Sequence, residues 1–207
     1  MTGRFLGSCF PAVQAQCQIN KGDPDNMKIL LLSGSFHQKS RTLALLNVVA
    51  GLLHEHECSI PALDKLPFYS EDLAGTNAPA TVRIFLDAVS AADGIVICTP
   101  EYNHSIPAVL KNAIDWASRP AFHSPLKDKP VTIITQAISP VGGARAQAHV
   151  KLVLDSTLSR IHPCHEMMVA EVDKKFDGQL QLTDEKTRER IARHLLDFNR
   201  FVSQCKG

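Results

Sequence analysis

Five short apolar runs alternate with longer segments of helical pattern, and this alternation constrains the fold of the chain more than any other feature. Unbroken apolar runs of this length are typical of strands that are buried on both faces of a sheet. The second run contains Pro61, which places it near a sheet edge. We therefore predict strands at residues 28–33, 58–63, 94–98, 130–135 and 166–172.

The segments between these runs have the length and residue spacing of helices. In one of them, Val82, Phe85 and Val89 recur at helical spacing. We predict helices at residues 42–53, 79–91, 108–118, 146–158 and 184–202. Regular alternation of strands and helices predicts a three-layer α/β domain with a parallel sheet and right-handed crossovers. In such a sheet the ligand lies beyond the carboxyl ends of the strands, where the strand order reverses.

The composition restricts the classes of partner. The chain has 207 residues, of which 44% are hydrophobic and 21% are charged, as expected for one globular domain. With 22 Lys and Arg against 21 Asp and Glu, the net charge of +1 gives no support for binding nucleic acid or an anionic membrane. No apolar run approaches the ~20 residues that a membrane-spanning helix needs.

The cysteines and the amino-terminal segment carry little functional signal. The six cysteines show no CxxC spacing, which disfavours a disulfide framework or a zinc site and favours a reducing cytoplasm. Residues 1–26 lack the continuous apolar core of a signal peptide and end in the turn-forming sequence KGDPDN. We interpret them as a disordered extension, and residues 27–207 as the folded domain.

The loop after the first predicted strand, SGSFHQKSRT at residues 33–42, is rich in hydroxyl groups. It also contains the cations Lys39 and Arg41, and Gly34 for a tight turn. It leads into a helix N-terminus, where free backbone N–H groups and the helix dipole favour an anion such as a terminal phosphate. The loop matches neither GxxxxGK[ST] nor GxGxxG, which argues against a nucleoside triphosphatase or a standard dinucleotide site. A serine-capped helix without a ligand is the alternative.

Two further loops follow predicted strands and have unusual composition. TPEYNHSIP at residues 99–107 combines a phenol ring with several hydrogen-bonding groups, and Pro107 suits the first turn of the next helix. A planar ring such as a flavin or a purine would suit this surface, and an ordinary capped loop is the alternative. QAISPVGGAR at residues 136–145 contains Gly142 and Gly143, which permit close backbone approach or a positive φ. Three such loops at one sheet edge together predict a ligand site.

Other side-chain clusters do not support a metal or catalytic centre. HEHEC at residues 54–58 lacks HExxH spacing, and HPCHE at residues 162–166 is interpreted as a loop with a buried thiol. The loop after Cys98 has no arginine of the kind that a phosphatase loop needs, and no GxSxG sequence occurs. The sequence therefore predicts no metal site.

The motifs resemble those of the NADPH-dependent FMN reductases of the flavodoxin-like superfamily, a group that includes bacterial quinone, chromate and azo-dye reductases. The most specific match is TPEYNHSIPAVLKNAIDWASRP, close to the family's PEYN…LKNAIDW pattern, while GSFHQKS and VGGARAQ correspond to its phosphate loop and GGAR segment. The resemblance covers residues 27–202. It implies a flavodoxin-like three-layer sandwich with a five-stranded parallel sheet in the order 2-1-3-4-5.

The resemblance also implies the cofactor and its contacts. FMN would bind non-covalently at the sheet edge, with NADPH or NADH as the electron donor. His37 and Thr42 stand where the family commonly has arginine and asparagine, and a neutral imidazole holds a phosphate less well than a guanidinium. The implied phosphate contacts are Ser35, His37, Ser40 and Thr42. The resemblance implies that the ring is lined by Pro100, Glu101, Tyr102 and Asn103, that Ser105 closes this loop, and that Gln136 lies near the ring.

The predicted function is that of a cytoplasmic, FMN-containing oxidoreductase. NAD(P)H would donate hydride, and free FMN, a quinone, an azo dye or a metal oxyanion would accept the electrons. The cofactor carries this chemistry, so no acid–base dyad is expected. The resemblance implies a homodimer or homotetramer.

One alternative is a flavodoxin-type electron carrier, which a net charge of +1 disfavours because such carriers present a strongly acidic surface. The other is a flavin-free interaction protein that keeps the fold.

Overall fold

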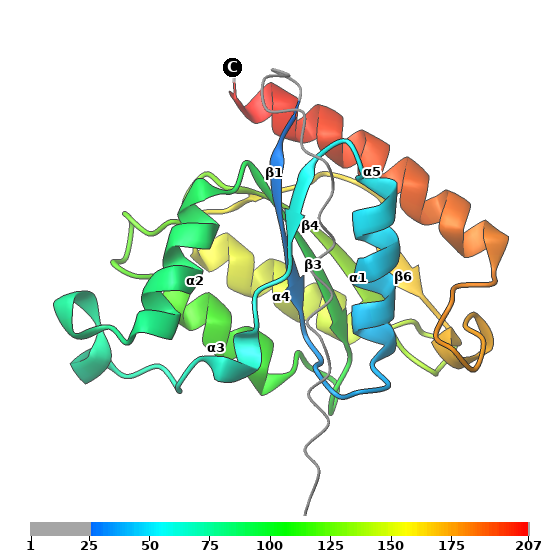
Figure 1. Cartoon of the computed structure of the whole chain (residues 1–207), viewed down its shortest axis with the longest axis horizontal. Helices are drawn as coiled ribbons and strands as arrows, with labels where there is room; N and C mark the ends of the chain where they lie inside the picture. The colour runs from blue at the N-terminus through cyan, green and yellow to red at the C-terminus, as the bar shows by residue number, and fades with distance from the viewer. Residues whose placement is uncertain (1–25, 207) are drawn as a thin grey trace, which may run out of the picture.

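A parallel β-sheet forms the middle layer of the structure, a computed structural model that describes residues 26–206 (Figure 1). The extension predicted at residues 1–26 lies almost wholly outside the described residues. The strands are β1 (Lys28–Ser33), β2 (Glu57–Ser59), β3 (Gly94–Pro100), β4 (Pro130–Gln136), β5 (Arg160–Ile161) and β6 (Met167–Val169). The order β2-β1-β3-β4-β5 confirms the predicted flavodoxin-like topology, and β6 adds a sixth strand that pairs with β4.

The two edges of the sheet differ from the sequence prediction. At one edge the strand predicted at residues 58–63 is only β2, since it ends before Pro61, which cannot donate to a ladder. At the other edge the strand predicted at residues 166–172 is only β6, and the two-residue strand β5 before it was not predicted. Pro163 separates β5 from β6, and Glu171 adopts a positive φ of 48° that turns the chain away after β6.

The helices lie close to their predicted positions and cover both faces of the sheet (Figure 1). They are α1 (Arg41–Leu52), α2 (Ala80–Ala91), α3 (Ala108–Ala117), α4 (Ala144–Ser156) and α5 (Glu185–Lys206), of which α5 continues beyond its predicted end. Short 3₁₀ turns occupy Leu63–Lys65, Glu71–Leu73, Gly75–Asn77 and Val172–Lys174. No helix among residues 26–206 is long and apolar enough to cross a membrane.

Alternate residues of each central strand enter two separate hydrophobic cores. In β1, Ile29 and Leu31 pack with α1 and α5, whereas Leu30 and Leu32 pack with α2, α3 and α4. Because both faces of β1 and β3 are covered, nearly every side chain of these strands is buried. This double burial explains why the strands appear in the sequence as unbroken apolar runs.

Strand register brings the carboxyl ends of the central strands to one level. Ser33 of β1 pairs with Cys98 of β3, and Pro100 of β3 pairs with Gln136 of β4. The loops that follow β1, β3 and β4 therefore leave the sheet together. The three loops selected from their composition converge at this edge.

Candidate functional site

The three loops surround an open cavity of ≈ 390 Å³ at the carboxyl edge of the sheet. Its volume lies within the range of small-molecule sites, ~300–1,000 Å³. Eight of the ten residues that the resemblance assigned to FMN line it: Ser35, His37, Ser40, Thr42, Pro100, Glu101, Tyr102 and Gln136. The cavity also includes residues outside that assignment: Lys39, Arg41, Ala137, Ile138, Ser139 and Val172.

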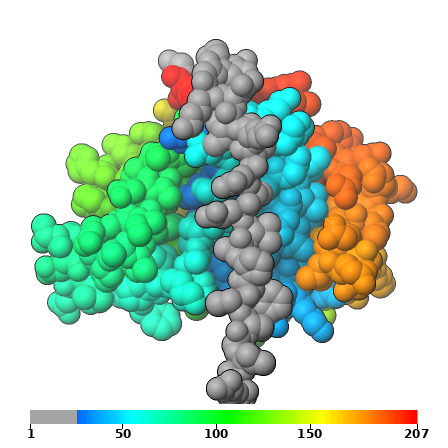
Figure 2. All heavy atoms as spheres, in the orientation of Figure 1, coloured from blue at the N-terminus to red at the C-terminus, as the bar shows by residue number. Residues whose placement is uncertain are grey.

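A second hollow of ≈ 580 Å³ lies between α1 and residues 179–182. In Figure 2, α1 in blue and the orange segment after β6 lie on the same face of the molecule. Of the residues assigned to FMN, only Ser40 also lines this hollow. This hollow does not join the loop after β1 to the loops after β3 and β4. The smaller cavity does, and it is therefore the candidate site.

Hydroxyl groups hold the loop after β1 in place before α1. Ser40 is the N-cap of α1, where its Oγ accepts a hydrogen bond from the Leu43 amide (3.3 Å) and donates to the Ser35 carbonyl (3.3 Å). Ser33 Oγ also donates to the Ser35 carbonyl, at 2.7 Å. The first amides of α1 have no partner within the helix. This fixed loop therefore presents a helix N-terminus to the cavity, as an anion site requires.

Two cations complete the anion site, and neither is among the FMN contacts that the family resemblance implies. Lys39 and Arg41 line the cavity next to Ser40. The Nε atom of Arg41 is buried and has no hydrogen-bond partner among the described residues. A buried charged donor without a partner is costly, and a phosphate oxygen would satisfy it. The residues present therefore fit a phosphorylated ligand, and the guanidinium of Arg41 supplies the permanent charge that His37 lacks.

Gln136 links the third loop to the phosphate end of the cavity. Its Nε2 donates a 3.0 Å hydrogen bond to Thr42 Oγ1, and both side chains are buried. This contact joins the end of β4 to the first turn of α1. Gly142 and Gly143 follow with φ values of 68° and 85°, which confirms the predicted need for glycine there.

The loop after β3 forms a tight two-residue turn. Tyr102 and Ser105 exchange backbone hydrogen bonds of 2.9 Å, with Asn103 and His104 between them at φ values of 49° and 63°. Positive φ at both central positions defines a type I′ turn, in which asparagine is favoured. The turn leaves Tyr102 at the cavity with 49% of its surface exposed.

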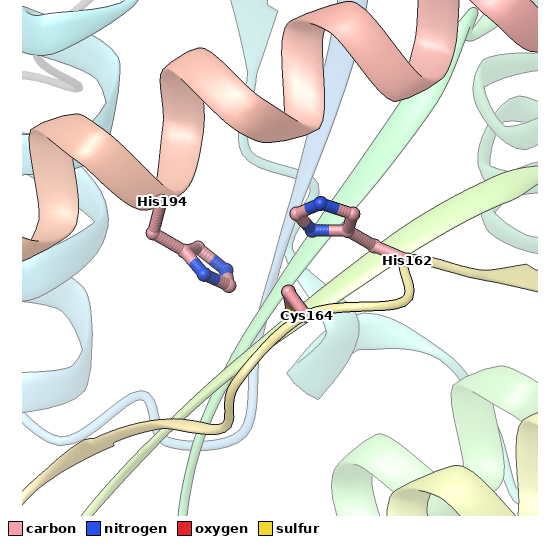
Figure 3. Close-up of side chains that lie close together, drawn as sticks. All are labelled: His162, Cys164 and His194. Atoms are coloured by element: carbon pink, nitrogen blue, oxygen red, sulfur yellow. The ribbon is translucent and has the colours of Figure 1, made fainter.

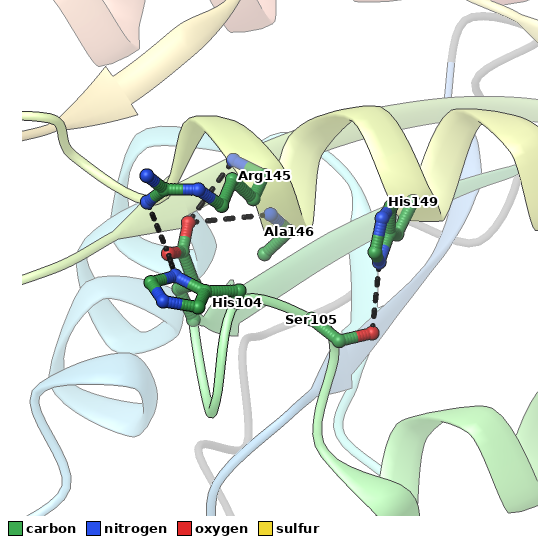
Figure 4. Close-up of polar contacts among 6 residues, drawn as sticks. His104, Ser105, Arg145, Ala146 and His149 are labelled. Carbon is green, nitrogen blue, oxygen red and sulfur yellow. Dashed lines mark hydrogen bonds and ion pairs between the residues drawn. The ribbon is translucent and has the colours of Figure 1, made fainter.

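Asn103 and Ser105 are not among the residues that line the cavity, so the ring contact implied for Asn103 stays a prediction. Asn103 lies in the turn, and Ser105 Oγ lies 2.9 Å from His149 Nδ1 of α4 (Figure 4). The local sequence gave no sign of this contact, because His149 lies 44 residues further along the chain.

The carboxylate of Glu101 binds α4 (Figure 4). Its Oε2 accepts hydrogen bonds from the amides of Arg145 (3.0 Å) and Ala146 (3.4 Å), and its Oε1 pairs with the Arg145 guanidinium (3.2 Å). Burial alone would raise the pKa of Glu101, but these hydrogen bonds outweigh it and hold the pKa below its ordinary value. Glu101 therefore lines the cavity while its charge caps α4, whose N-cap Gly143 has no side chain to do so.

The KNAIDW part of the motif has a structural role. Asn112 accepts from the Tyr69 amide (2.8 Å) and donates to the Pro67 carbonyl (2.9 Å), and Trp116 Nε1 donates to the same carbonyl at 2.8 Å. These contacts fasten the segment after β2 to α3. Trp116 is buried and packs edge-on against Tyr69.

The fold and the cavity together define a flavodoxin-like protein with a candidate site for a phosphorylated ligand at the carboxyl edge of a parallel sheet. A sequence model described as NADPH-dependent FMN reductase matches residues 27–173. The chain belongs to this family.

Individual relatives support the same family membership. The chain is 36% identical over 186 residues to an NAD(P)H-dependent FMN reductase of Pseudomonas aeruginosa, covering 88% of this chain and 99% of the relative. It is 36% identical over 150 residues to a quinone reductase of Escherichia coli, covering 72% and 79%. The solved structure of FerB, a flavoenzyme NAD(P)H:(acceptor) oxidoreductase of Paracoccus denitrificans, is similar with a TM-score of 0.76 and 28% identity, covering 86% and 98%.

Proposed function

We propose that this chain uses bound FMN to transfer electrons from NADPH or NADH to a small acceptor such as free FMN, a quinone, an azo dye or a metal oxyanion. The observation that carries the proposal is the cavity itself, because one hollow joins an anion site at the N-terminus of α1 to an exposed aromatic loop after β3. That arrangement suits a ligand with a phosphate at one end and a planar ring at the other.

The residues of the chain bind and orient rather than react. Ser35, Ser40 and Thr42, with Lys39 and Arg41, hold the phosphate end. Pro100, Tyr102 and Gln136 hold the ring, and the bound flavin supplies the hydride-accepting chemistry. Of the described residues that line the cavity, only Glu101 carries a carboxylate, and it is already bound to α4.

Cys98 is not positioned to act as a nucleophile. It lies fully buried in β3, and burial raises the pKa of its thiol well above its ordinary value. The rim of the cavity is instead exposed and apolar: Ile138 is 71% exposed and Tyr102 is 49% exposed. This rim suits the stacking of a nicotinamide and then of an aromatic acceptor.

The visible spectrum of the purified protein tests the function. We expect flavin absorption bands that bleach when NADPH is added without oxygen and return when a quinone is added, with steady NADPH oxidation while quinone lasts. Bands that never bleach with NADPH or NADH, but do with dithionite, would instead indicate an electron carrier. A colourless protein that leaves added FMN fully fluorescent would support the flavin-free alternative.

We propose further that the chain assembles as a homodimer or homotetramer through the outer surface near α4. Leu152 of α4 is 71% exposed and Phe122 is 73% exposed, and Phe122, Val153 and Leu158 line one hollow of ≈ 270 Å³. Light scattering should give two or four times the chain mass of 22.7 kDa. Leu152→Glu should shift the mass to that of one chain, whereas Ile84→Glu on α2, also 70% exposed, should not. A monomeric wild-type protein would contradict the proposal.

We also propose a cytoplasmic location. Cys98, Cys164 and Cys205 form no disulfide in the part of the chain that the structure describes. Free thiols are typical of a reducing compartment. Alkylation of the protein in intact cells should find Cys98, Cys164 and Cys205 reduced, and oxidation of any of these three in the cell would contradict the location.

A further inference from the structure

Three side chains with metal-binding atoms meet near the opposite end of β4 from the flavin cavity (Figure 3). His162 follows β5, Cys164 lies two residues further on, and His194 comes from α5. One ligand atom of each lies within 4.8 Å of the other two. They gather around Thr132 near the start of β4, whereas Gln136 at the end of β4 lines the flavin cavity.

Hydrogen bonds orient both imidazoles toward a common centre. Thr132 Oγ1 lies 3.1 Å from His162 Nδ1 and 2.7 Å from His194 Nε2. On its other side, His162 Nε2 lies 3.1 Å from a carboxylate oxygen of Asp197. A carboxylate only accepts, so Nε2 of His162 carries the proton and Nδ1 presents a lone pair to the cluster. A carboxylate behind a histidine is the usual second contact of a metal-binding imidazole.

The surroundings bury the two imidazoles and fix their rings. His162 is 5% exposed and His194 is 9% exposed, while Cys164 and Asp197 lie nearer the surface and leave a route for an ion. Phe201 stacks on the His162 ring at 5.4 Å, and Phe198 packs beside it.

We propose that His162, Cys164 and His194 bind one Zn²⁺ ion. Two imidazole nitrogens and one sulfur suit a borderline-soft ion, whereas Mg²⁺ and Ca²⁺ require oxygen ligands. Atoms bound to one tetrahedral Zn²⁺ lie roughly 3.5 Å apart, so the cluster contracts by about 1 Å on binding. Cys164 releases its thiol proton to solvent, and His194 carries its proton on Nδ1 instead of Nε2. Water takes the fourth position.

The ion would act as a structural link. His162 and Cys164 lie between β5 and β6, where the sheet edge is split into two short strands, and His194 lies on α5. Zn²⁺ would tie this edge to the carboxyl-terminal helix. An ion that binds only the folded chain stabilises it by mass action. At a free Zn²⁺ concentration about 100-fold above Kd, we expect the Tm to rise by about 5–10 °C.

Zinc titration of the untagged, flavin-loaded full chain, first stripped with a chelator, tests the site. We expect one Zn²⁺ per chain in competition with a chromophoric chelator, the rise in Tm, and unchanged NADPH oxidation. Cys164→Ser should weaken Zn²⁺ binding by at least about 10-fold, and Asp197→Asn by about 10-fold, with little change in the metal-free Tm because both residues are partly exposed.

Matched controls separate this site from incidental binding. His165→Gln and Cys205→Ser change a histidine and a cysteine outside the cluster and should leave Zn²⁺ affinity unchanged. The proposal is overturned if stripped wild-type protein binds no Zn²⁺, or if Cys164→Ser binds it as tightly as the wild type. Equal losses in the controls would also overturn it, as would tight binding of Cu⁺ without Zn²⁺. If no metal ion binds, the cluster is a polar network centred on Thr132.

Discussion

The Gly34→Ala protein is expected to lose most of its affinity for FMN and to unfold at a lower temperature than the wild type. A Cβ atom at Gly34 would lie 2.3 Å from Thr99 Oγ1, 2.8 Å from Thr99 Cβ and 3.0 Å from Pro100 Cδ. These atoms belong to the end of β3, so no flexible side-chain tip can move aside. The loops after β1 and β3 would have to separate, although the Gly34 amide now donates to the Cys98 carbonyl at 2.8 Å.

This separation would disturb the binding site, because the loops after β1 and β3 hold opposite ends of the ligand. Ser35 follows Gly34 directly, and Pro100 begins the ring-binding loop. Overpacking of this kind costs about 1–3 kcal/mol, and a displaced loop loses its ligand contacts as well. We expect the Kd for FMN, measured by fluorescence quenching, to rise at least about 10-fold, the equivalent of ~1.4 kcal/mol.

Gly51 provides the matched control. It lies in α1, and a Cβ atom there would have no neighbour within 4 Å. Gly51→Ala should therefore raise the free energy of unfolding by about 1 kcal/mol through helix propensity and leave the Kd for FMN unchanged. If Gly34→Ala binds FMN as the wild type does, the close approach of the two loops is not what shapes the site.

Gly34 also shows where sequence reasoning reached the right residue for an incomplete reason. The sequence predicts a tight turn at Gly34, but the φ of Gly34 does not lie in the left-handed region, unlike those of Gly142 and Gly143. The structure requires glycine because Thr99 lies so near. That contact joins residues 65 positions apart, and no local pattern encodes it.

The central fold was predictable because its cause is local. Residues of β1 and β3 face covered surfaces on both sides, so burial alone produces the unbroken apolar runs. The edge strands were less predictable. β5 has two residues and β6 has three, too few to show a period, and Pro163 rather than hydrophobicity decides where they break.

The residues of the candidate site also fall into those that the sequence predicts and those that it does not. Ser35, Ser40 and Pro100 lie in contiguous motifs and line the cavity as expected. Glu101 is a different case, because its carboxylate pairs with Arg145 at the start of α4, and the sequence does not show that pairing. The cluster of His162, Cys164 and His194 escaped the sequence analysis for the same reason. Its third member lies 30 residues beyond the second, on another element.

Arg41→Gln is expected to weaken FMN binding by about 10- to 100-fold, because a hydrogen bond to a charged group contributes about 1.5–3 kcal/mol. Arg41 lines the phosphate end of the cavity, and its buried Nε has no partner among residues 26–206. The same unpaired buried Nε–H makes the ligand-free protein less stable than it could be. We therefore expect the Tm of the flavin-free variant to be equal to or higher than that of the flavin-free wild type.

Riboflavin separates the phosphate contact from general damage, because it carries the same ring without the phosphate. Arg41→Gln should leave riboflavin affinity unchanged, and Arg193→Gln, which removes one exposed charge from α5, should change neither affinity. Equal losses for FMN and riboflavin would mean that Arg41 shapes the loop rather than binds the phosphate. Adding His37→Arg to the variant returns a permanent charge to the same loop. If FMN affinity then partly recovers and riboflavin affinity does not change, a cation at position 37 can replace the cation at position 41. In that case Arg41 compensates for the missing arginine at position 37, and the departure from the family motif preserves the electrostatics of the site.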